Sequence, residues 1–307
     1  MPISTLVGFL QAVERQLHAW TSTSLSALPN FPVRPDIEEW AKTAWFRGHS
    51  ESRWKLLPSV YRLSGYTAQR EVDMNRSFQM KATFLSDLPS QQDLPAWLSL
   101  MQHHGLPTRL LDWSESSTIA LYFAIETYRD YLRWERKRWF RPVVWMLNPH
   151  ALNWIGTNGS GSIVPSTDLY ERAGNDKDGW TIAWGCANVF PAFGASHPQG
   201  MNYQGPMAVK PHVIDRRMHA QRSRFTVHGS RPDPMEDMFR GDAANDLIGL
   251  GFLHEIRIDP AAAGGLLQQL AAIGITRSTL FPDLEGIAAE SVAAITGAAG
   301  RDLPVSE

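Results

Sequence analysis

The stretch from residue 102 to residue 116, QHHGLPTRLLDWSES, strongly constrains the local fold. Gly105 and Pro107 impose a turn, because glycine tolerates unusual backbone angles and proline fixes its own φ. Apolar and polar residues then alternate up to Asp112, and residues 117–139 have the pattern of a helix that is buried at its start and solvated at its end. A segment that only filled a core would not carry so many polar groups. The stretch therefore predicts a turn and a helix start that form one wall of a binding site.

The polar residues of this stretch allow two interpretations. Asp112 and Ser114 precede the predicted helix, where such side chains most often cap free backbone N–H groups. The same helix start is also suited to an anion, because its free N–H groups and its dipole favour negative charge. His103 and His104 are able to transfer a proton near neutral pH, although a single histidine more often makes a structural hydrogen bond. Both interpretations stay open at this point.

Three further stretches carry polar side chains at positions where they could contact a ligand or cap a helix. Arg47 is followed by Gly48 at the end of a short apolar segment, where the arginine can point into a cleft while the glycine lets the backbone come close to a ligand. The planar guanidinium of Arg47 suits a phosphate or a carboxylate. Gln221 lies in a basic stretch that leads into a predicted strand, where its amide would face a ligand. Asp283 is predicted to cap the last helix. The alternatives are an ion-paired arginine for Arg47 and a solvated basic flank for the region of Gln221.

The pattern of apolar residues predicts an α+β fold. Short apolar segments typical of strands span residues 43–50, 141–149, 222–229 and 253–260. Helical patterns span residues 3–20, 68–88, 94–103, 117–139 and 261–274, and residues 275–295 predict a short strand, a turn and a last helix. Residues 150–205 look irregular, which is typical of a functional loop such as a lid. We expect one domain with a mixed or antiparallel sheet flanked by helices.

The composition argues against several classes of protein. The formal net charge of −2 over 307 residues disfavours broad non-specific binding to nucleic acid. Cys186 is the single cysteine, so we expect no internal disulfide and no cysteine zinc site. A single cysteine also fits a reducing compartment, and we predict a cytoplasmic location. No apolar run reaches the length of about 18 residues that a membrane span requires. The histidine spacing fits no zinc helix, and no Gly-rich phosphate loop or Gly-x-Ser-x-Gly elbow is present. We therefore predict no metal and no membrane partner.

Four blocks of the sequence together resemble the FRG domain family, over roughly residues 40–290. The family's aromatic-Arg-Gly motif corresponds to Phe46, Arg47 and Gly48, which are followed by WKLLPSVYR with Arg62 at its end. The longest block is QHHGLPTRLLDWSESSTIALYFA, and the last two are QRSRFTV and TLFPDLEGIA. We assign residues 31–307 to the FRG domain and residues 1–30 to an N-terminal helical segment. Members of the family are mostly bacterial and often occur in mobile or defence contexts.

A more distant resemblance, to ADP-ribosyltransferases, implies a ligand and roles. In those enzymes an early arginine or histidine, a middle Ser/Thr/Tyr group and a late glutamate build an NAD site. Arg47 would hold the phosphates and Tyr122 would stack on a ring of the ligand. In those enzymes the glutamate lies on a late strand, where this resemblance places Gln221, and glutamine does not ionise. Glu285 is an alternative carboxylate, which nothing in the sequence places in the site.

These comparisons lead to three functional hypotheses. The first is a nucleotide-binding enzyme, either an NAD-dependent ADP-ribosyltransferase or an NAD hydrolase that acts as a bacterial defence or toxin-type effector. The predicted catalytic residues are Arg47, His103, Asp112 and Gln221, and the predicted cofactor-binding residues are Arg47, Arg62, Thr108, Arg109, Ser116 and Tyr122. The second is a non-catalytic module that binds a nucleotide or a partner protein. The third is a nuclease or nucleic-acid-binding protein that uses the basic residues of 133–141 and 216–224.

Overall fold

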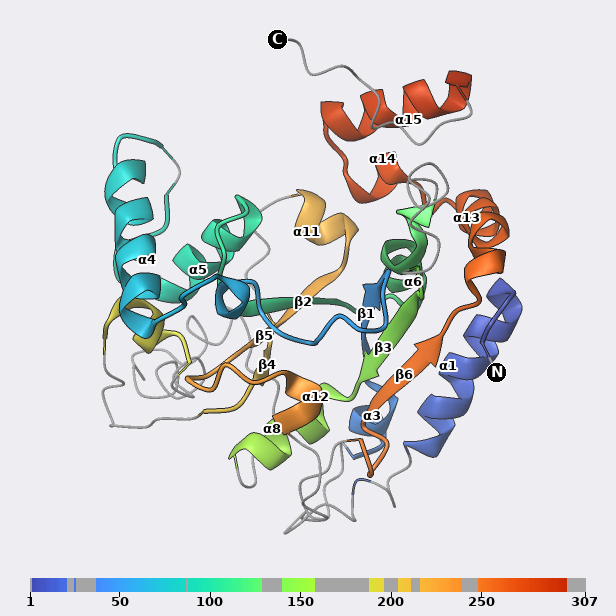
Figure 1. Cartoon of the computed structure of the whole chain (residues 1–307), viewed down its shortest axis with the longest axis horizontal. Helices are drawn as coiled ribbons and strands as arrows, with labels where there is room; N and C mark the ends of the chain where they lie inside the picture. Colours follow the sequence, from blue (N-terminus) through green and yellow to red (C-terminus); the bar gives the residue numbers. More distant parts are fainter. Residues whose placement is uncertain are drawn as a thin grey trace.

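The computed structural model describes residues 2–20, 25, 37–86, 88–128, 140–157, 188–195, 204–210, 216–238 and 248–296. The described chain forms one sheet with helices around it (Figure 1). The strands are β1 (Trp45–His49), β2 (Leu110–Ser114), β3 (Val143–Leu147), β4 (Met207–Val209), β5 (Ser223–Val227) and β6 (Leu253–Arg257). They lie in the order β4-β5-β2-β1-β3-β6, and each neighbouring pair is antiparallel. The expected single-domain α+β fold with an antiparallel sheet is confirmed.

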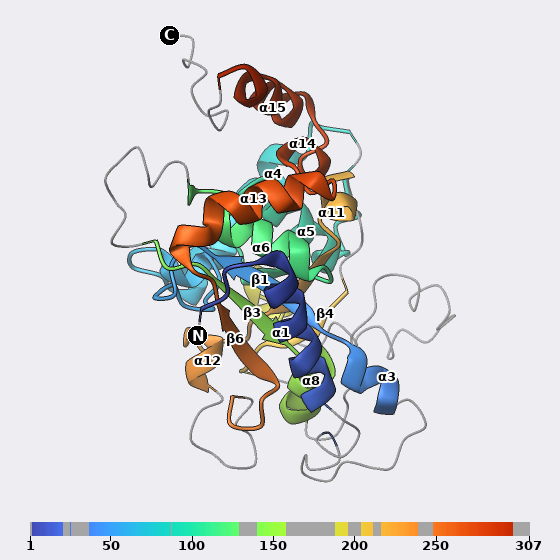
Figure 2. The ribbon, with the colours of Figure 1, turned by 90° about the vertical axis from the view of Figure 1, so that its right-hand side faces the viewer.

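The helix that follows β2 packs directly on β1. This helix, α6 (Ser117–Ile125), is apolar almost all round and buries residues on every side, including Ala120 and Ala124. Ser116 begins it, since its hydroxyl accepts from the backbone N–H of Ile119 at 3.4 Å. A second helix, α13 (Ala263–Ala272), contacts α6 from above, so that α13, α6 and β1 form successive layers (Figure 2).

The predicted N-terminal helix is confirmed as α1 (Leu6–Ala19). Thr5 caps it by accepting from the backbone N–H of Gly8 at 3.0 Å. The apolar positions Leu6, Phe9 and Val13 lie three to four residues apart and face the main core, which is the spacing of an amphipathic helix. This helix therefore belongs to the same hydrophobic core as β1, β3 and β6.

A second core lies under the other half of the sheet. It contains α4 (Ala68–Ala82), α5 (Leu94–His103), the short helix η3 (Phe190–Phe193) and apolar residues of β2, β4 and β5. The prediction for α5 is confirmed at both ends, because Asp93 caps its start and the backbone at Gly105 turns with a positive φ of 77° just beyond its end. The remaining short elements are α3 (Ile37–Lys42), η1 (Val60–Arg62), α11 (Arg216–Ala220), α12 (Met235–Met238) and η4 (Pro260–Ala262).

Two parts of the predicted pattern were wrong. Residues 150–157, expected to be irregular, belong to α8 (Pro149–Thr157), because Asn148 accepts from the N–H groups of His150 and Ala151 and a proline occupies the first turn. The expected strand near residue 276 is instead the start of α14 (Arg277–Leu280), where Thr276 and Thr279 cap each other's backbone N–H.

The last helix is α15 (Leu284–Thr296), and the predicted cap at its start is confirmed. Asp283 accepts from the backbone N–H of Gly286 at 2.7 Å. Several other predictions fall outside the described residues: the solvated end of the helix at 129–139, Cys186, and most of the expected lid, at 158–187 and 196–203. Within the described ranges, no helix has both the length and the apolar character needed to cross a bilayer.

Candidate functional site

A cleft of about 430 Å³ lies where β1 and β2 separate. The ladder between these two strands contains a single residue pair, Phe46 with Ser114, whereas β1–β3 and β2–β5 contain five pairs each. In Figure 1, β2 runs across the view while β1 runs nearly vertically, so the strands diverge from this point. Both strands contribute to the lining, with Arg47 and Gly48 from β1 and Asp112 and Trp113 from β2.

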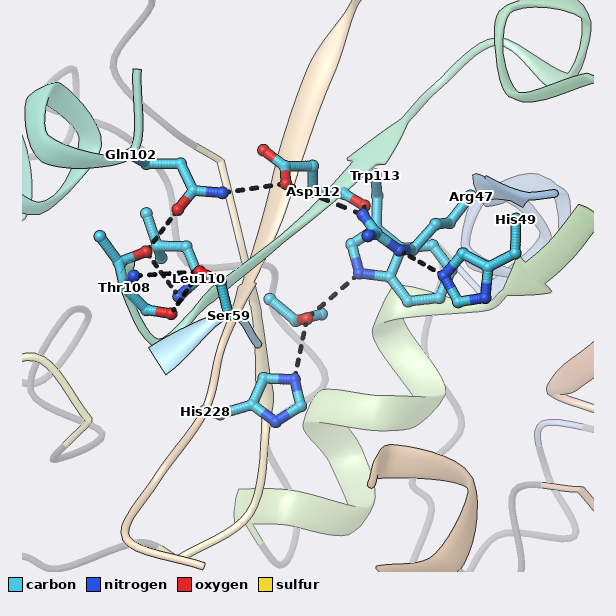
Figure 3. Close-up of polar contacts among 10 residues, drawn as sticks. Arg47, His49, Ser59, Gln102, Thr108, Leu110, Asp112, Trp113 and His228 are labelled. Carbon is cyan, nitrogen blue, oxygen red and sulfur yellow. Dashed lines mark hydrogen bonds and ion pairs between the residues drawn. The ribbon is translucent and has the colours of Figure 1, made fainter. Parts of the chain in front are cut away.

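Arg47 joins the two diverging strands. Its Nη1 donates to the backbone carbonyl of Asp112 at 2.6 Å, and its Nε donates to Nε2 of His49 at 2.9 Å (Figure 3). The nearest carboxylate oxygen is Oδ2 of Asp112, which lies 3.8 Å from Nη1. Among the described residues, none accepts a hydrogen bond from Nη2. The side chain is 22% exposed, so within the described part of the chain Nη2 is left for a ligand.

The charge of Arg47 is only partly compensated. Burial lowers the pKa of Arg47, the charge of Asp112 raises it, and the charge of Arg62 lowers it, with a net lowering. Arginine nevertheless stays protonated in proteins, so the cleft holds a cation that is poorly solvated. Burial, followed by the charge of Arg47, lowers the pKa of His49 to about 3, and the neighbouring backbone of Trp54 opposes the shift. His49 is therefore neutral and leaves the positive charge of Arg47 in place.

A chain of hydrogen bonds holds Asp112. Nε2 of Gln102, at the end of α5, donates to Oδ2 of Asp112 at 2.9 Å. Oε1 of Gln102 accepts from the hydroxyl of Thr108 at 2.5 Å, and this hydroxyl accepts from the backbone N–H of Leu110 at 3.1 Å. Figure 3 shows the Gln102 amide between its two partners. The carboxylate of Asp112 is 54% exposed and lines the cleft.

Aromatic side chains form other walls of the cleft. Trp54 is 47% exposed, and its ring meets that of His49 edge-on with centroids 6.1 Å apart. Trp113 is buried, and its Nε1 donates to the hydroxyl of Thr226 at 3.1 Å. Phe123 of α6 also lines the cleft. Trp54 is the ring that has a large surface left for a ligand.

The cleft also contains a second cation and a second carboxylate. Arg217 of α11 lines it and lies over the ring of Phe281, 4.5 Å from the centroid. Glu126, just after α6, lines it as well. Sequence reasoning missed Trp54, Gln102, Glu126 and Arg217. Gln102 belongs to the stretch 102–116, which was predicted to form one wall of a binding site. No sequence pattern near Trp54 or Glu126 indicates that Trp54 is exposed or that Glu126 lies at the cleft.

Three of the predicted catalytic residues meet in the cleft. Arg47, Asp112 and Gln221 all line it. Asp112 was expected just before a helix, but it lies inside β2 because residues 110–114 pair fully with β5, and the helix cap is Ser116 rather than Ser114. Gln221 was expected on a strand, but it lies in the turn before β5, and its amide donates to the backbone carbonyl of Leu280 at 3.1 Å.

The other predicted residues have different surroundings. Arg109 is 1% exposed and forms a two-bonded ion pair with Glu71 at 2.7 and 2.8 Å, so it holds β2 to α4. The other predicted residues do not line the cleft. Thr108 contacts Gln102, which does line it, Ser116 caps α6, and Tyr122 is buried in the core. His103 packs edge-on against His104, and Arg62 is exposed on η1. The side chain of Glu285 lies outside the described residues.

Comparison with known proteins gives a match to a family model that covers part of this site. No curated protein and no solved structure matches the chain. Within the described residues, no group of three or more His, Cys, Asp or Glu side chains is arranged to hold a metal ion. The blocks around residues 221 and 281 fall outside the range matched by a family model. The model of the FRG domain matches residues 42–132, which include Arg47, Gln102 and Asp112, so this part of the chain is similar to an FRG domain.

Proposed function

We propose that the cleft between β1 and β2 binds a nucleotide, with a phosphate on Arg47 and the base against Trp54. The observation that carries this proposal is Nη2 of Arg47, which has no partner among the described residues and belongs to a poorly compensated guanidinium at the wall of an open cleft. A phosphate accepts hydrogen bonds from a guanidinium and restores the solvation that burial removes. Arg217 supplies a second positive charge on the same cleft.

The aromatic lining supports a nucleotide over a simple anion. Trp54 presents nearly half of its surface beside the site of the charge. A flat base that stacks on an indole gains about 1–3 kcal/mol. An inorganic phosphate would leave this ring unused, whereas a nucleotide carries both groups at a fixed separation.

Among nucleotides, we propose NAD as the substrate. Gln221 stands where the resemblance to ADP-ribosyltransferases implies a carboxylate. Two other carboxylates, those of Asp112 and Glu126, line the cleft. Cleavage of NAD breaks the bond between ribose C1′ and nicotinamide, which leaves with the bonding electrons, and water adds to C1′ and releases a proton. A carboxylate beside the nicotinamide ribose stabilises the positive charge that develops there. Consumption of NAD is the chemistry that a defence or toxin-type effector in the cytoplasm would use.

The proposal is tested by thermal unfolding with millimolar NAD, ATP and ADP-ribose, followed by chromatography of the NAD sample. We expect stabilisation by all three and a nicotinamide peak. The variant Arg47→Ala should lose the stabilisation, whereas Arg231→Ala, at an exposed arginine paired with Asp233, should keep it. Stabilisation without nicotinamide would instead favour a non-catalytic binding module. No stabilisation by any of the three would contradict the proposal.

A further inference from the structure

The direction of the hydrogen bonds around Gln102 is fixed by chemistry. The Thr108 hydroxyl already accepts from the N–H of Leu110, so its proton is free to be donated to Oε1 of Gln102. If the Gln102 amide were reversed, its oxygen would face Oδ2 of Asp112, and two acceptors would meet. The amide nitrogen therefore faces Asp112, as Figure 3 shows.

Thr108 is itself held in place. It is fully buried, and its backbone N–H donates to the hydroxyl of Ser59 at 3.2 Å. Its backbone carbonyl accepts from the N–H of Val60, also at 3.2 Å. These contacts to the segment before η1 fix the Thr108 hydroxyl, which fixes the Gln102 amide. The amide in turn restricts the rotation of the Asp112 carboxylate.

One oxygen of Asp112 is left for a ligand. Oδ2 accepts from Gln102, whereas Oδ1 has no hydrogen-bond partner among the described residues. A carboxylate oxygen is an acceptor only, so a ligand must bring a donor to it. A phosphate would be repelled there, but a hydroxyl would be bound. Arg47 and Asp112 thus define two neighbouring positions of opposite charge, 3.8 Å apart at Nη1 and Oδ2.

We infer that the Asp112 carboxylate binds a hydroxyl of the adenosine ribose of the nucleotide, and that Gln102 and Thr108 are positioning residues for it. This inference rests on the proposed nucleotide binding and adds a selection for ribose over deoxyribose. A ribonucleotide places its hydroxyls a few bonds away from its phosphate, which suits the adjacent Asp112 and Arg47.

The test compares ADP, the moiety that ATP, NAD and ADP-ribose share, with 2′-deoxy-ADP and 3′-deoxy-ADP by calorimetry. We expect ADP to bind at least about tenfold more tightly than one of the deoxy analogues, because the loss of one hydrogen bond to a charged group weakens affinity by about this factor. Equal affinity for all three would overturn this inference and leave the nucleotide proposal standing. Absence of binding by all three would overturn both.

Variants separate positioning from folding. Asp112→Ala, Gln102→Glu and Thr108→Val should bring the affinity ratio of ADP to its deoxy analogue close to one, and Thr108→Ser should restore it. Gln69→Glu is the matched control, because Gln69 donates to Asp73 at 2.8 Å in a similar pair on exposed α4. If Gln102→Glu and Thr108→Val weaken ADP and the deoxy analogues equally, their role is structural and the positioning role is wrong.

Discussion

Gly48 of β1 lies against the backbone of Ala120 in α6. A β-carbon at Gly48 would overlap the carbonyl oxygen of Ala120 and the amide nitrogen of Ala124. Glycine at this position therefore lets the helix approach the strand at backbone distance. Because Gly48 and Ala120 both line the cleft, this close contact also sets the shape of its floor.

We predict that Gly48→Ala destabilises the protein by more than about 3 kcal/mol, because backbone atoms cannot move aside as a side chain would. Gly265→Ala is the control, since a β-carbon at this exposed position of α13 meets no atom within 4 Å. That substitution should stabilise the protein by about 1 kcal/mol through helix propensity. Urea unfolding of both variants measures the difference. Equal stability of the two would contradict the role of the close packing.

The motif residues illustrate what the sequence predicts and what it does not. The strand at residues 45–49 follows from its apolar run, and the glycine after Arg47 was expected to allow a close approach of the backbone. The sequence suggested a ligand as the neighbour of this glycine, whereas the structure shows a helix. Local patterns predict elements, but the partner of a small residue depends on contacts between distant segments.

The site shows the same division. Arg47 and Gln221 are 174 positions apart, yet the pairing of β1 with β2 and of β2 with β5 brings them to one cleft. Arg109 was expected to bind a ligand because it lies among other polar residues. Its carboxylate partner is on α4, 38 positions earlier, and no periodic pattern links the two. A buried ion pair and a ligand site therefore have the same appearance in a sequence.

The ion pair of Arg109 with Glu71 gives the next prediction. Both side chains are buried, so removal of one partner leaves an isolated charge in the core. Arg109→Met should cost about 3–5 kcal/mol of stability, and addition of Glu71→Leu should recover most of this loss. Arg231→Ala, which breaks a surface pair of similar length, should cost less than about 1 kcal/mol. The measurement is urea unfolding, and additive losses in the double variant would contradict the pairing.

His228 predicts a dependence of stability on pH. It lies directly after β5 and is fully buried, and burial, followed by the charges of Arg109 and Arg47, lowers its pKa to about 3. The unfolded chain takes up this proton near its ordinary value of 6.5, so the unfolded state binds more protons between these limits. Stability should therefore be full above about pH 6.5 and fall as the pH decreases, by up to about 1.4 kcal/mol per unit for this group.

The variant His228→Gln isolates this contribution. Glutamine does not titrate, so the slope of unfolding free energy against pH, between about pH 6.5 and pH 4.5, should decrease by up to about 1.4 kcal/mol per pH unit. This decrease corresponds to the loss of one proton taken up on unfolding. The free-energy difference from the natural protein above pH 7 measures lost packing and serves as the internal reference. An unchanged slope would show that His228 titrates normally in the folded state.

Trp54 allows the nucleotide proposal to be tested away from any charge. Its ring is nearly half exposed and packs on His49 by one edge, so Trp54→Ala should leave the fold intact. Loss of base stacking should weaken nucleotide binding by about 1–3 kcal/mol, while Trp54→Phe keeps most of the affinity. Phe84→Ala removes an even more exposed ring outside the cleft and is the control. Binding of ADP by calorimetry gives the comparison. If Trp54→Ala binds as tightly as Phe84→Ala, the base does not rest on this wall, and Arg47 holds the ligand by its phosphate alone.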